Sequence, residues 1–205
     1  MKMYFSYNLP DLSLALAIAA QTAEFSDILG VGSLLLFSDG IQAVKSFKAQ
    51  FPTKDICVEA RVSEKAREAI TMMAQAGATY VSVLAGTWPA TIKKATEIAH
   101  AYNIKIGLDL IDAPSGGQAA LDAKAQGVDF LIMHRHSEIT EDSDFETDWH
   151  NIRDNSDIPI FVTGSIDASH MQQIMDLKPQ GIMIGSAITK SENPAHVART
   201  LHALI

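Results

Sequence analysis

Short apolar runs alternate with helical patterns along the whole 205-residue chain, and this alternation restricts its fold more than any other feature. The runs are rich in Val, Ile, Leu and Phe and nearly continuous, which is typical of parallel strands covered on both faces. Eight such units without a long irregular loop predict an α/β protein with a (β/α)8 barrel. The expected strands are Met3–Tyr7, Asp27–Gly32, Ile56–Arg61, Tyr80–Ala85, Lys105–Leu110, Phe130–Arg135, Pro159–Gly164 and Gly181–Gly185.

The helical patterns lie between these runs, and a doubly wound open sheet is the alternative arrangement. An open sheet of that kind usually carries a glycine-rich fingerprint after its first strand, whereas here the first turn reads "NLPD". No linker-like stretch divides the chain, so one domain over residues 1–205 is expected. The expected helices cover residues 12–24, 40–50, 64–76, 89–102, 117–126, 144–155, 167–177 and 193–204.

Charge and cysteine content exclude several classes of function. The formal net charge is -8 and no basic cluster stands out, so neither a nucleic acid nor a membrane surface is an expected partner. The single cysteine, Cys57, rules out an internal disulfide, and its apolar neighbours predict a buried thiol. The apolar N-terminal stretch is interrupted by Asn8, Pro10 and Asp11, which argues against a signal peptide and favours a cytoplasmic protein.

Three charges close the third expected strand, in "VEARVSE". Side chains alternate along a strand, so Glu59 and Arg61 share a face, and Val58 and Ala60 pack on the other side. Barrel active sites lie at the carboxyl ends of the strands, which favours a polar site here over a purely structural Glu–Arg pair. Glu64 fits either that site or a solvated helix start.

Polar residues also close the fifth and sixth strands. Asp109 ends "GLDL", and His134 and His136 share one face in "IMHRHSE". An imidazole at a barrel mouth can move a proton near neutral pH. The H-x-H pair also resembles two metal ligands, although no third ligand follows at a telling spacing.

A Gly-Ser pair follows each of the last two strands, as Gly164-Ser165 and Gly185-Ser186. Glycine allows a close backbone approach, and in barrels the loops after the seventh and eighth strands often bind phosphate. Two tight turns without a ligand are the alternative. The pattern favours a small phosphorylated substrate.

These residues together resemble the orotidine-monophosphate decarboxylase superfamily, in the branch of 3-hexulose-6-phosphate synthase and 3-keto-L-gulonate-6-phosphate decarboxylase. The resemblance runs over nearly the whole chain, and the C-terminal stretch looks more like the synthase. The stretches that carry it are "FSDILGVGSLLLFSDGIQAVKSFKAQFP", "AGATYVSVLAG", "IGLDLIDAP", "GVDFLIMHRHSE", "IPIFVTGSI" and "GSAITKSENPAHVAR".

The family signature D-x-K-x-x-D matches Glu59, Arg61 and Glu64 in spacing and in sign of charge. The resemblance implies that Glu59 helps to hold Mg2+ and that Arg61 stabilises an enediolate. It also implies that Glu64 reaches the active site of a partner subunit in a homodimer, and that His134 transfers a proton. Asn8, Asp109 and His136 are the expected substrate-binding residues.

The chain departs from the family pattern at three positions of the site. Asn8 and Gly30 stand where the family has acids, and Arg61 stands where it has a lysine, which is not a conservative exchange. A weak Mg2+ site or none is therefore expected. The sequence favours a carbon–carbon lyase of a phosphorylated ketose, acting like the synthase with formaldehyde. The alternatives are the decarboxylase reaction, a sugar-phosphate epimerase, or a phosphate-ligand binding protein without catalysis.

Overall fold

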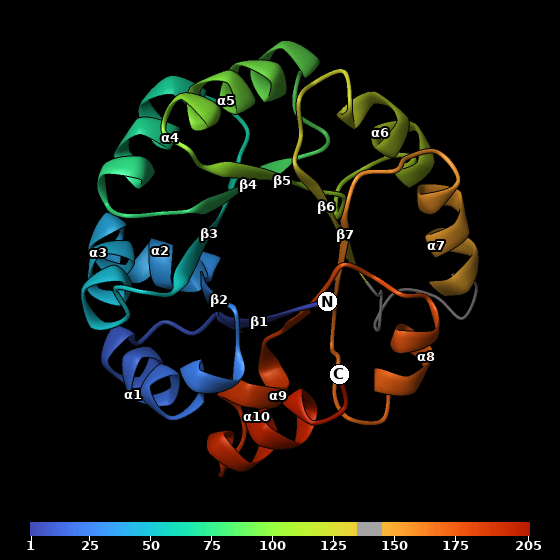
Figure 1. Cartoon of the computed structure of the whole chain (residues 1–205). Coiled ribbons are helices and arrows are strands. Elements are labelled where there is room, and N and C mark those ends of the chain that lie inside the picture. Colours follow the sequence, from blue (N-terminus) through green and yellow to red (C-terminus); the bar gives the residue numbers. More distant parts are fainter. Residues whose placement is uncertain (135–144) are drawn as a thin grey trace.

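The computed structural model describes residues 1–134 and 145–205, and it forms a closed barrel of eight parallel strands surrounded by helices (Figure 1). Each strand pairs with the next in sequence, and β8 closes the barrel on β1 with Lys2 opposite Gly181. The strands are β1 (Lys2–Tyr7), β2 (Ile28–Val31), β3 (Asp55–Val62), β4 (Tyr80–Leu84), β5 (Lys105–Asp109), β6 (Phe130–His134), β7 (Ile160–Thr163) and β8 (Gly181–Ile184).

Helices connect the strands and form the outer layer of the barrel (Figure 1). The predicted barrel is confirmed, and the open sheet is wrong. The helices are α1 (Leu12–Thr22), the 3-10 turn η1 (Ala23–Phe25), α2 (Ser33–Asp39), α3 (Ile41–Gln50), α4 (Ala66–Gln75), α5 (Pro89–Ala101), α6 (Gly116–Ala123), α7 (Phe145–Arg153), α8 (Met171–Asp176), α9 (Ser186–Thr189) and α10 (Pro194–His202).

Two short helices, α2 and α9, were not predicted from the sequence. The segment of α2 reads "SLLLFSD" and has no regular apolar stripe, because Leu34 and Phe37 are exposed while Leu35 is buried. In α9, four residues are too few to establish a helical period. The predicted helix over residues 167–177 is shorter in the structure, where α8 begins at Met171.

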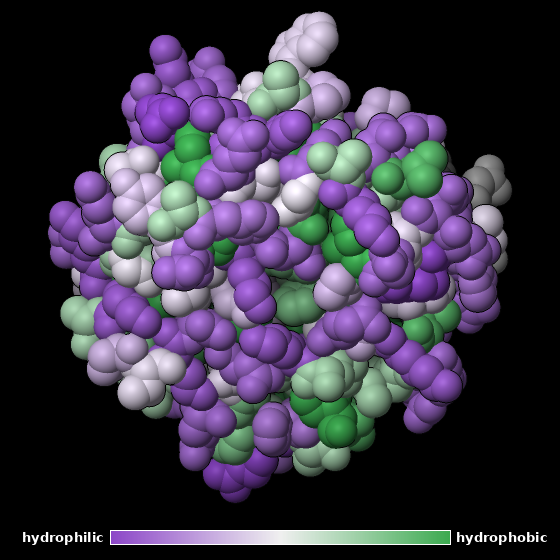
Figure 2. Space-filling view, turned by 45° about the horizontal axis from the view of Figure 1, so that its top comes forward, coloured by the Kyte–Doolittle hydropathy of each residue, from purple (hydrophilic) through white to green (hydrophobic). Residues whose placement is uncertain are grey.

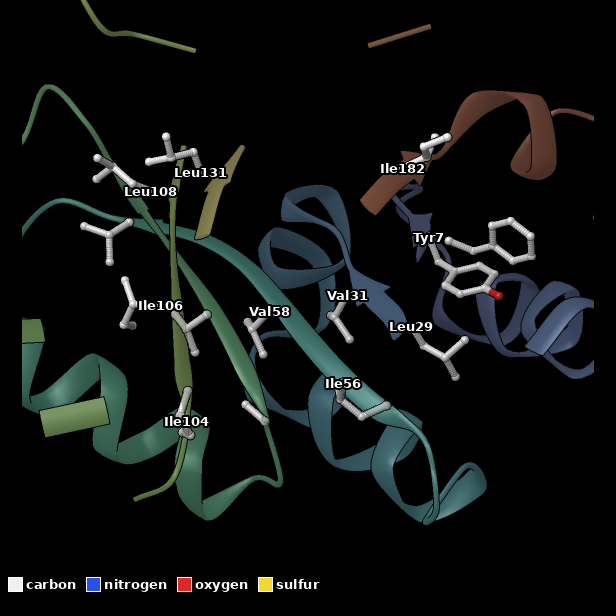
Figure 3. Close-up of a cluster of buried hydrophobic side chains, with 14 of the residues drawn as sticks. Tyr7, Leu29, Val31, Ile56, Val58, Ile104, Ile106, Leu108, Leu131 and Ile182 are labelled. Carbon is white, nitrogen blue, oxygen red and sulfur yellow. The ribbon is translucent and has the colours of Figure 1, made fainter. Parts of the chain in front are cut away.

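The larger part of the core lies between the strands and the helices (Figure 3). Along β1, every residue from Met3 to Tyr7 is buried, because alternate side chains face the helices and the barrel interior. This burial on both faces explains why the strands read as continuous apolar runs. The side chains labelled in Figure 3 belong to this part of the core, and they are Tyr7, Leu29, Val31, Ile56, Val58, Ile104, Ile106, Leu108, Leu131 and Ile182.

A second, smaller cluster fills the inside of the barrel and forms the floor beneath the carboxyl ends of the strands. Its aromatic rings fit because a neighbouring strand carries glycine: a Cβ atom at Gly107 would lie 2.3 Å from the Phe130 ring. Cys57 belongs to this cluster and is fully buried, as its apolar neighbours predicted. The cluster consists of Tyr4, Ile28, Cys57, Tyr80, Phe130, Ile132, Phe161 and Met183.

The outer surface is mainly hydrophilic on the face that Figure 2 shows, and hydrophobic residues occur there in small groups. Among the described residues, every helix is too short or too polar to cross a bilayer. Two aromatic side chains are strongly exposed: Phe37, on α2, is 83% exposed, and Trp88, directly before α5, is 80% exposed.

Candidate active site

The end of β3 departs from regular strand geometry. Its register against β4 shifts between Val58 and Val62, and the backbone of Arg61 has a φ of 47°, in the left-handed region. The Arg61 backbone N–H donates to Oγ of Ser82 on β4, with 3.0 Å between N and O, and this bond fixes the irregular segment. Such a bulge re-aims side chains at the rim of a barrel. Glu59 and Arg61 both line one cavity, although the strand between them does not alternate regularly.

Three strands bring Arg61, Asp109 and His134 into direct contact. Asp109, at the end of β5, is only 3% exposed. Its Oδ2 accepts a hydrogen bond from Nε of Arg61 at 2.9 Å, and its Oδ1 lies 2.7 Å from Nε2 of His134. The backbone N–H of Ile111 also donates to Oδ1, at 3.1 Å. A nearly buried carboxylate is thus shared by two basic side chains from neighbouring parts of the barrel.

The charges around Asp109 set its ionisation. Burial acts to raise its pKa, but the hydrogen bonds and charges of His134 and Arg61 outweigh burial, and the net pKa is lowered. Burial acts in the opposite sense on Arg61, yet the bond and charge of Asp109 raise the pKa of the guanidinium. Asp109 is therefore a carboxylate at neutral pH and accepts the Nε2 proton of His134. Whenever this imidazole is neutral, the bond from Nε2 leaves the lone pair on Nδ1, the nitrogen that can act as a base.

Glu59 has a different partner, the phenol of Tyr4. The Tyr4 hydroxyl donates to Oε1 of Glu59 at 2.7 Å, from a side chain that is fully buried inside the barrel. On the neighbouring strand, Gly30 offers no side chain, and a Cβ atom there would lie 2.6 Å from the same Oε1. One carboxylate oxygen of Glu59 is thus fixed from below.

The two Gly-Ser turns line the same cavity as Glu59 and Arg61. Gly164 has a φ of 105° and Ser165 a φ of 48°, a sharp turn that glycine adopts without strain. Gly185 and Ser186 begin α9 and line the cavity with them. The side chain of Lys190, at the end of α9, also reaches this cavity. Backbone N–H groups and a lysine together form a suitable place for a phosphate group.

One cavity of about 380 Å³ is lined by both turns and Lys190 and also by Glu59, Arg61 and His134. A second cavity of about 310 Å³, lined by Ser115, Asp148 and other residues, reaches His134 from the side of α6 and α7. We take the first cavity as the candidate active site because Glu59 and Arg61 from the end of β3 and His134 from the end of β6 line it together.

Three predicted site residues have other positions or roles. Asn8 lines the cavity, but its Oδ1 accepts the backbone N–H of Leu34 at 2.8 Å, so its amide caps the start of α2. Glu64 is exposed and lies outside the cavity of its own chain, because the chain leaves the barrel after Val62. His136 lies outside the described residues.

The sequence interpretation missed three residues that the structure brings to the site. Tyr4 was counted as part of an apolar strand, and nothing in its neighbours signals a polar contact. Side chains alternate along a strand, so Ser6, two residues after Tyr4 on β1, points to the same side and lines the cavity. Lys190 follows "GSAIT", and a cation one helical turn after a Gly-Ser pair was a signal that could have found it.

The donors at the site do not fit a tight Mg2+ site. Mg2+ prefers about six oxygen ligands in an octahedron, usually with one or two carboxylates. Glu59 is already bonded to Tyr4, Asp109 is shared by Arg61 and His134, and Gly30 supplies no ligand. Within the described residues, no group of three or more His, Cys, Asp or Glu side chains could hold a metal ion. The alternative H-x-H site cannot be placed, since it requires His136.

The chain matches known sequences over part and over all of its length. The family model described as dihydrouridine synthase (Dus) matches residues 74–204, a stretch that begins after Glu59 and Arg61. Several relatives named 3-hexulose-6-phosphate synthase match the whole chain. The one from Bacillus subtilis (strain 168) is 25% identical, with 100% of this chain and 99% of the relative covered. The one from Mycobacterium gastri is 24% identical, with 100% of both covered.

Solved structures share the fold over nearly the whole chain. A crystal structure of 3-hexulose-6-phosphate synthase superposes with a TM-score of 0.93, at 24% identity and full coverage of both chains. The 3-keto-L-gulonate-6-phosphate decarboxylase of Vibrio cholerae gives a TM-score of 0.85 at 23% identity, with 99% of this chain and 96% of that chain covered. Orotidine 5'-monophosphate decarboxylase from Methanocaldococcus jannaschii gives 0.85 at 18% identity, with 99% and 97% covered. The chain thus belongs to the family of the Dus model over residues 74–204 and, over its whole length, to the orotidine-monophosphate decarboxylase superfamily, in the branch of 3-hexulose-6-phosphate synthase and 3-keto-L-gulonate-6-phosphate decarboxylase.

Proposed function

We propose that the chain is a carbon–carbon lyase of sugar phosphates that catalyses the aldol reaction of the 3-hexulose-6-phosphate synthases. The observation that carries this proposal is the single cavity that the two Gly-Ser turns and Lys190 share with Glu59, Arg61 and His134. The full-length relatives support it, because their matches include the end of β3. The Dus match begins after that segment and so gives no information on Glu59 and Arg61.

The name of the relatives and the mass balance of the reaction together give the proposed substrate. A hexulose 6-phosphate that releases formaldehyde leaves a pentulose 5-phosphate, and the reverse reaction joins the two. The phosphate would be held by the turns at Gly164-Ser165 and Gly185-Ser186, with Lys190 as counter-ion. The sugar would then extend across the cavity toward Glu59 and Arg61. A cavity of about 380 Å³ suits a ligand of this size.

His134 is the proposed base in the direction of synthesis. Its Nδ1 takes a proton from the carbon next to the ketose carbonyl, and the C–H electron pair moves to the carbonyl oxygen, which gives an enediolate. The enediolate carbon then attacks the carbon of formaldehyde, and the former aldehyde oxygen takes up a proton. Asp109 holds Nε2 at 2.7 Å and so fixes both the ring and its tautomer.

Arg61 is the proposed group that stabilises the enediolate oxygen. Its Nε is bound to Asp109, and among the described residues the two terminal amino groups have no acceptor of their own. A guanidinium fixed in place before the reaction stabilises developing negative charge without reorganisation. Glu59, whose Oε1 is bound to Tyr4, would accept a hydrogen bond from a sugar hydroxyl through its other oxygen.

The chain is proposed to work as a cytoplasmic homodimer with shared active sites. Support comes from Glu64, which is exposed and lies outside the cavity of its own chain, as a residue that serves a partner would. The exposed Phe37 and Trp88 follow β2 and β4 and supply apolar surface near the same rim. Divalent metal is proposed to be weakly bound or unnecessary, in line with the donors at Glu59.

A direct assay tests the reaction. The purified protein is incubated with ribulose 5-phosphate or xylulose 5-phosphate and formaldehyde, and the loss of formaldehyde is followed. His134→Asn should lose about 10²–10⁴-fold in kcat, whereas His196→Asn, on the exposed face of α10, should not. Release of CO2 from 3-keto-L-gulonate 6-phosphate would identify the decarboxylase reaction instead. Interconversion of the two pentulose phosphates without formaldehyde would identify an epimerase, and binding without turnover a non-catalytic protein.

A further inference from the structure

Tyr4 combines two properties that a residue of the barrel floor does not need. Its ring packs in the interior cluster with Cys57, and its side chain is fully buried. Its hydroxyl, however, points out of this apolar layer and donates to Glu59 at 2.7 Å. Hydrogen bonds to an ionised acceptor are roughly twice as strong as neutral ones, so this contact orients the carboxylate. A phenylalanine would fill the same space without that contact.

Gly30 makes this contact sterically possible. A Cβ atom at Gly30 would lie 2.3 Å from Cε2 and 2.5 Å from the hydroxyl of Tyr4, and 2.6 Å from Oε1 of Glu59. Any side chain at position 30 would therefore displace the phenol or the carboxylate. The resemblance places a metal-binding acid at this same position. The phenol of Tyr4 and an acidic side chain at position 30 are thus mutually exclusive.

We propose that Tyr4 is a positioning residue that, together with Gly30, replaces a metal ligand and holds Glu59 for a substrate hydroxyl in a site that works without divalent metal. The inference rests on the proposed function for the identity of the substrate. The donor stays protonated, because burial raises the pKa of Tyr4 well above its usual value. A metal ion at Oε1 of Glu59 would have to displace this phenol and would find no second carboxylate on β2.

The exchange also gives a physical reason for Arg61. A site without a divalent cation must stabilise the enediolate by a side chain that is always charged, and arginine meets this requirement better than lysine. Arg61 is only partly exposed and is anchored by Asp109 at 2.9 Å. Tyr4, Gly30 and Arg61 together therefore take over the role that a metal ion would have in this site.

Two matched tyrosines test the positioning role. Tyr4→Phe removes the hydroxyl that holds Glu59. Tyr7→Phe removes an equally buried hydroxyl of the same strand, which is bonded to Thr22 at 2.8 Å on the helix side. If Tyr4 positions Glu59, Tyr4→Phe should lower kcat about 10–100-fold with a smaller change in KM, while Tyr7→Phe keeps kcat within about twofold. Equal kinetics of the two variants would overturn the role of Tyr4.

Metal binding gives a second readout that needs no turnover. Calorimetric titration of the wild-type protein with Mg2+ should give no binding, and EDTA should not change the activity. The double variant Tyr4→Ala with Gly30→Glu removes the ring and adds a carboxylate beside Glu59. It should gain stability with Mg2+, whereas Tyr4→Ala alone should not. Mg2+ binding by the wild type that is lost in Glu59→Gln would overturn the inference.

The two proposals fail in distinguishable ways. If no pentulose 5-phosphate reacts with formaldehyde, the proposed function fails, and calorimetry then decides on Tyr4 through binding of ribulose 5-phosphate. Tyr4→Phe should weaken that binding at least threefold relative to Tyr7→Phe, since Glu59 would be free to turn away. No difference between the two variants, in binding as in kcat, counts against a positioning role.

Discussion

Nε2 of His134 lies 2.7 Å from Oδ1 of Asp109, and this contact assigns the two imidazole nitrogens different tasks. Because Asp109 is also bound to Arg61, its negative charge is secured at the same time. Asp109→Asn keeps the shape but offers Nε2 an amide that can present either its oxygen or its nitrogen. We expect kcat to fall by about 10²–10⁴-fold with a folded protein, because His134 loses its fixed tautomer. Retained activity would show that the Asp109 carboxylate is not needed to fix the tautomer of His134.

The lowered pKa of Asp109 predicts a dependence of stability on pH. The folded pKa lies below the ordinary value of 3.8, so the unfolded chain takes up the proton first as the pH falls. The stability that ionised Asp109 adds to the folded protein is complete above that ordinary pKa and is lost as the pH drops through the folded pKa. Urea unfolding between pH 3 and 7 should show that Asp109→Asn loses less stability on acidification than the wild type. Asp122→Asn, on the exposed face of α6, serves as the control.

Phosphate binding should depend on the turns after β7 and β8 and on Lys190. Inorganic phosphate should raise the thermal unfolding midpoint by mass action. Gly185→Val should abolish this gain: its Cβ would lie 3.6 Å from the Ser6 carbonyl oxygen, an ordinary contact, while its methyl groups would enter the cavity. Lys190→Gln should reduce the gain and Lys45→Gln, on α3, should not. An unchanged shift in Gly185→Val would contradict the assignment.

Glu64 gives a test of shared active sites. Glu64→Ala and His134→Ala are each expected to be inactive as homodimers and folded. In a purified heterodimer of the two, one site carries both lesions, and the other combines an intact His134 with an intact Glu64 from the partner. Recovery of up to about half of the wild-type activity per dimer is expected. A heterodimer as inactive as its parents, or a fully active Glu64→Ala, would return Glu64 to a solvated helix start.

The fold was predictable because burial on both faces of each strand leaves a direct record in the sequence. The eight runs match the eight strands to within two residues at each end. The strand ends also showed where charges would gather, so Glu59, Arg61 and His134 were expected near one another. The sequence did not predict which of these side chains form hydrogen bonds with one another. Alternation along a strand tells to which side a side chain points, but it does not tell how far apart two side chains on different strands lie. The bulge at Arg61, which shifts the register, leaves no clear pattern in "VEARV".

Residues that act through an apolar layer were the hardest to find. Tyr4 lies in "MYFSY", where a tyrosine reads as core, and its contact with Glu59 spans 55 residues of sequence. Lys190 and Ser6 were missed because each belongs to an element that packs well without a ligand. Asn8, which is expected to bind substrate, lines the cavity, and its Oδ1 also accepts the backbone N–H of Leu34, a contact across 26 residues that the sequence did not reveal.

The left-handed backbone at Arg61 has a consequence for the evolution of this site. A non-glycine residue with a φ of 47° raises the energy of the folded chain by about 1 kcal/mol, and glycine would relieve that strain. Selection for heat resistance alone would therefore work against a long cationic side chain here. Activity and thermal tolerance are opposed at position 61, so a lineage that no longer needs the reaction should lose this arginine early.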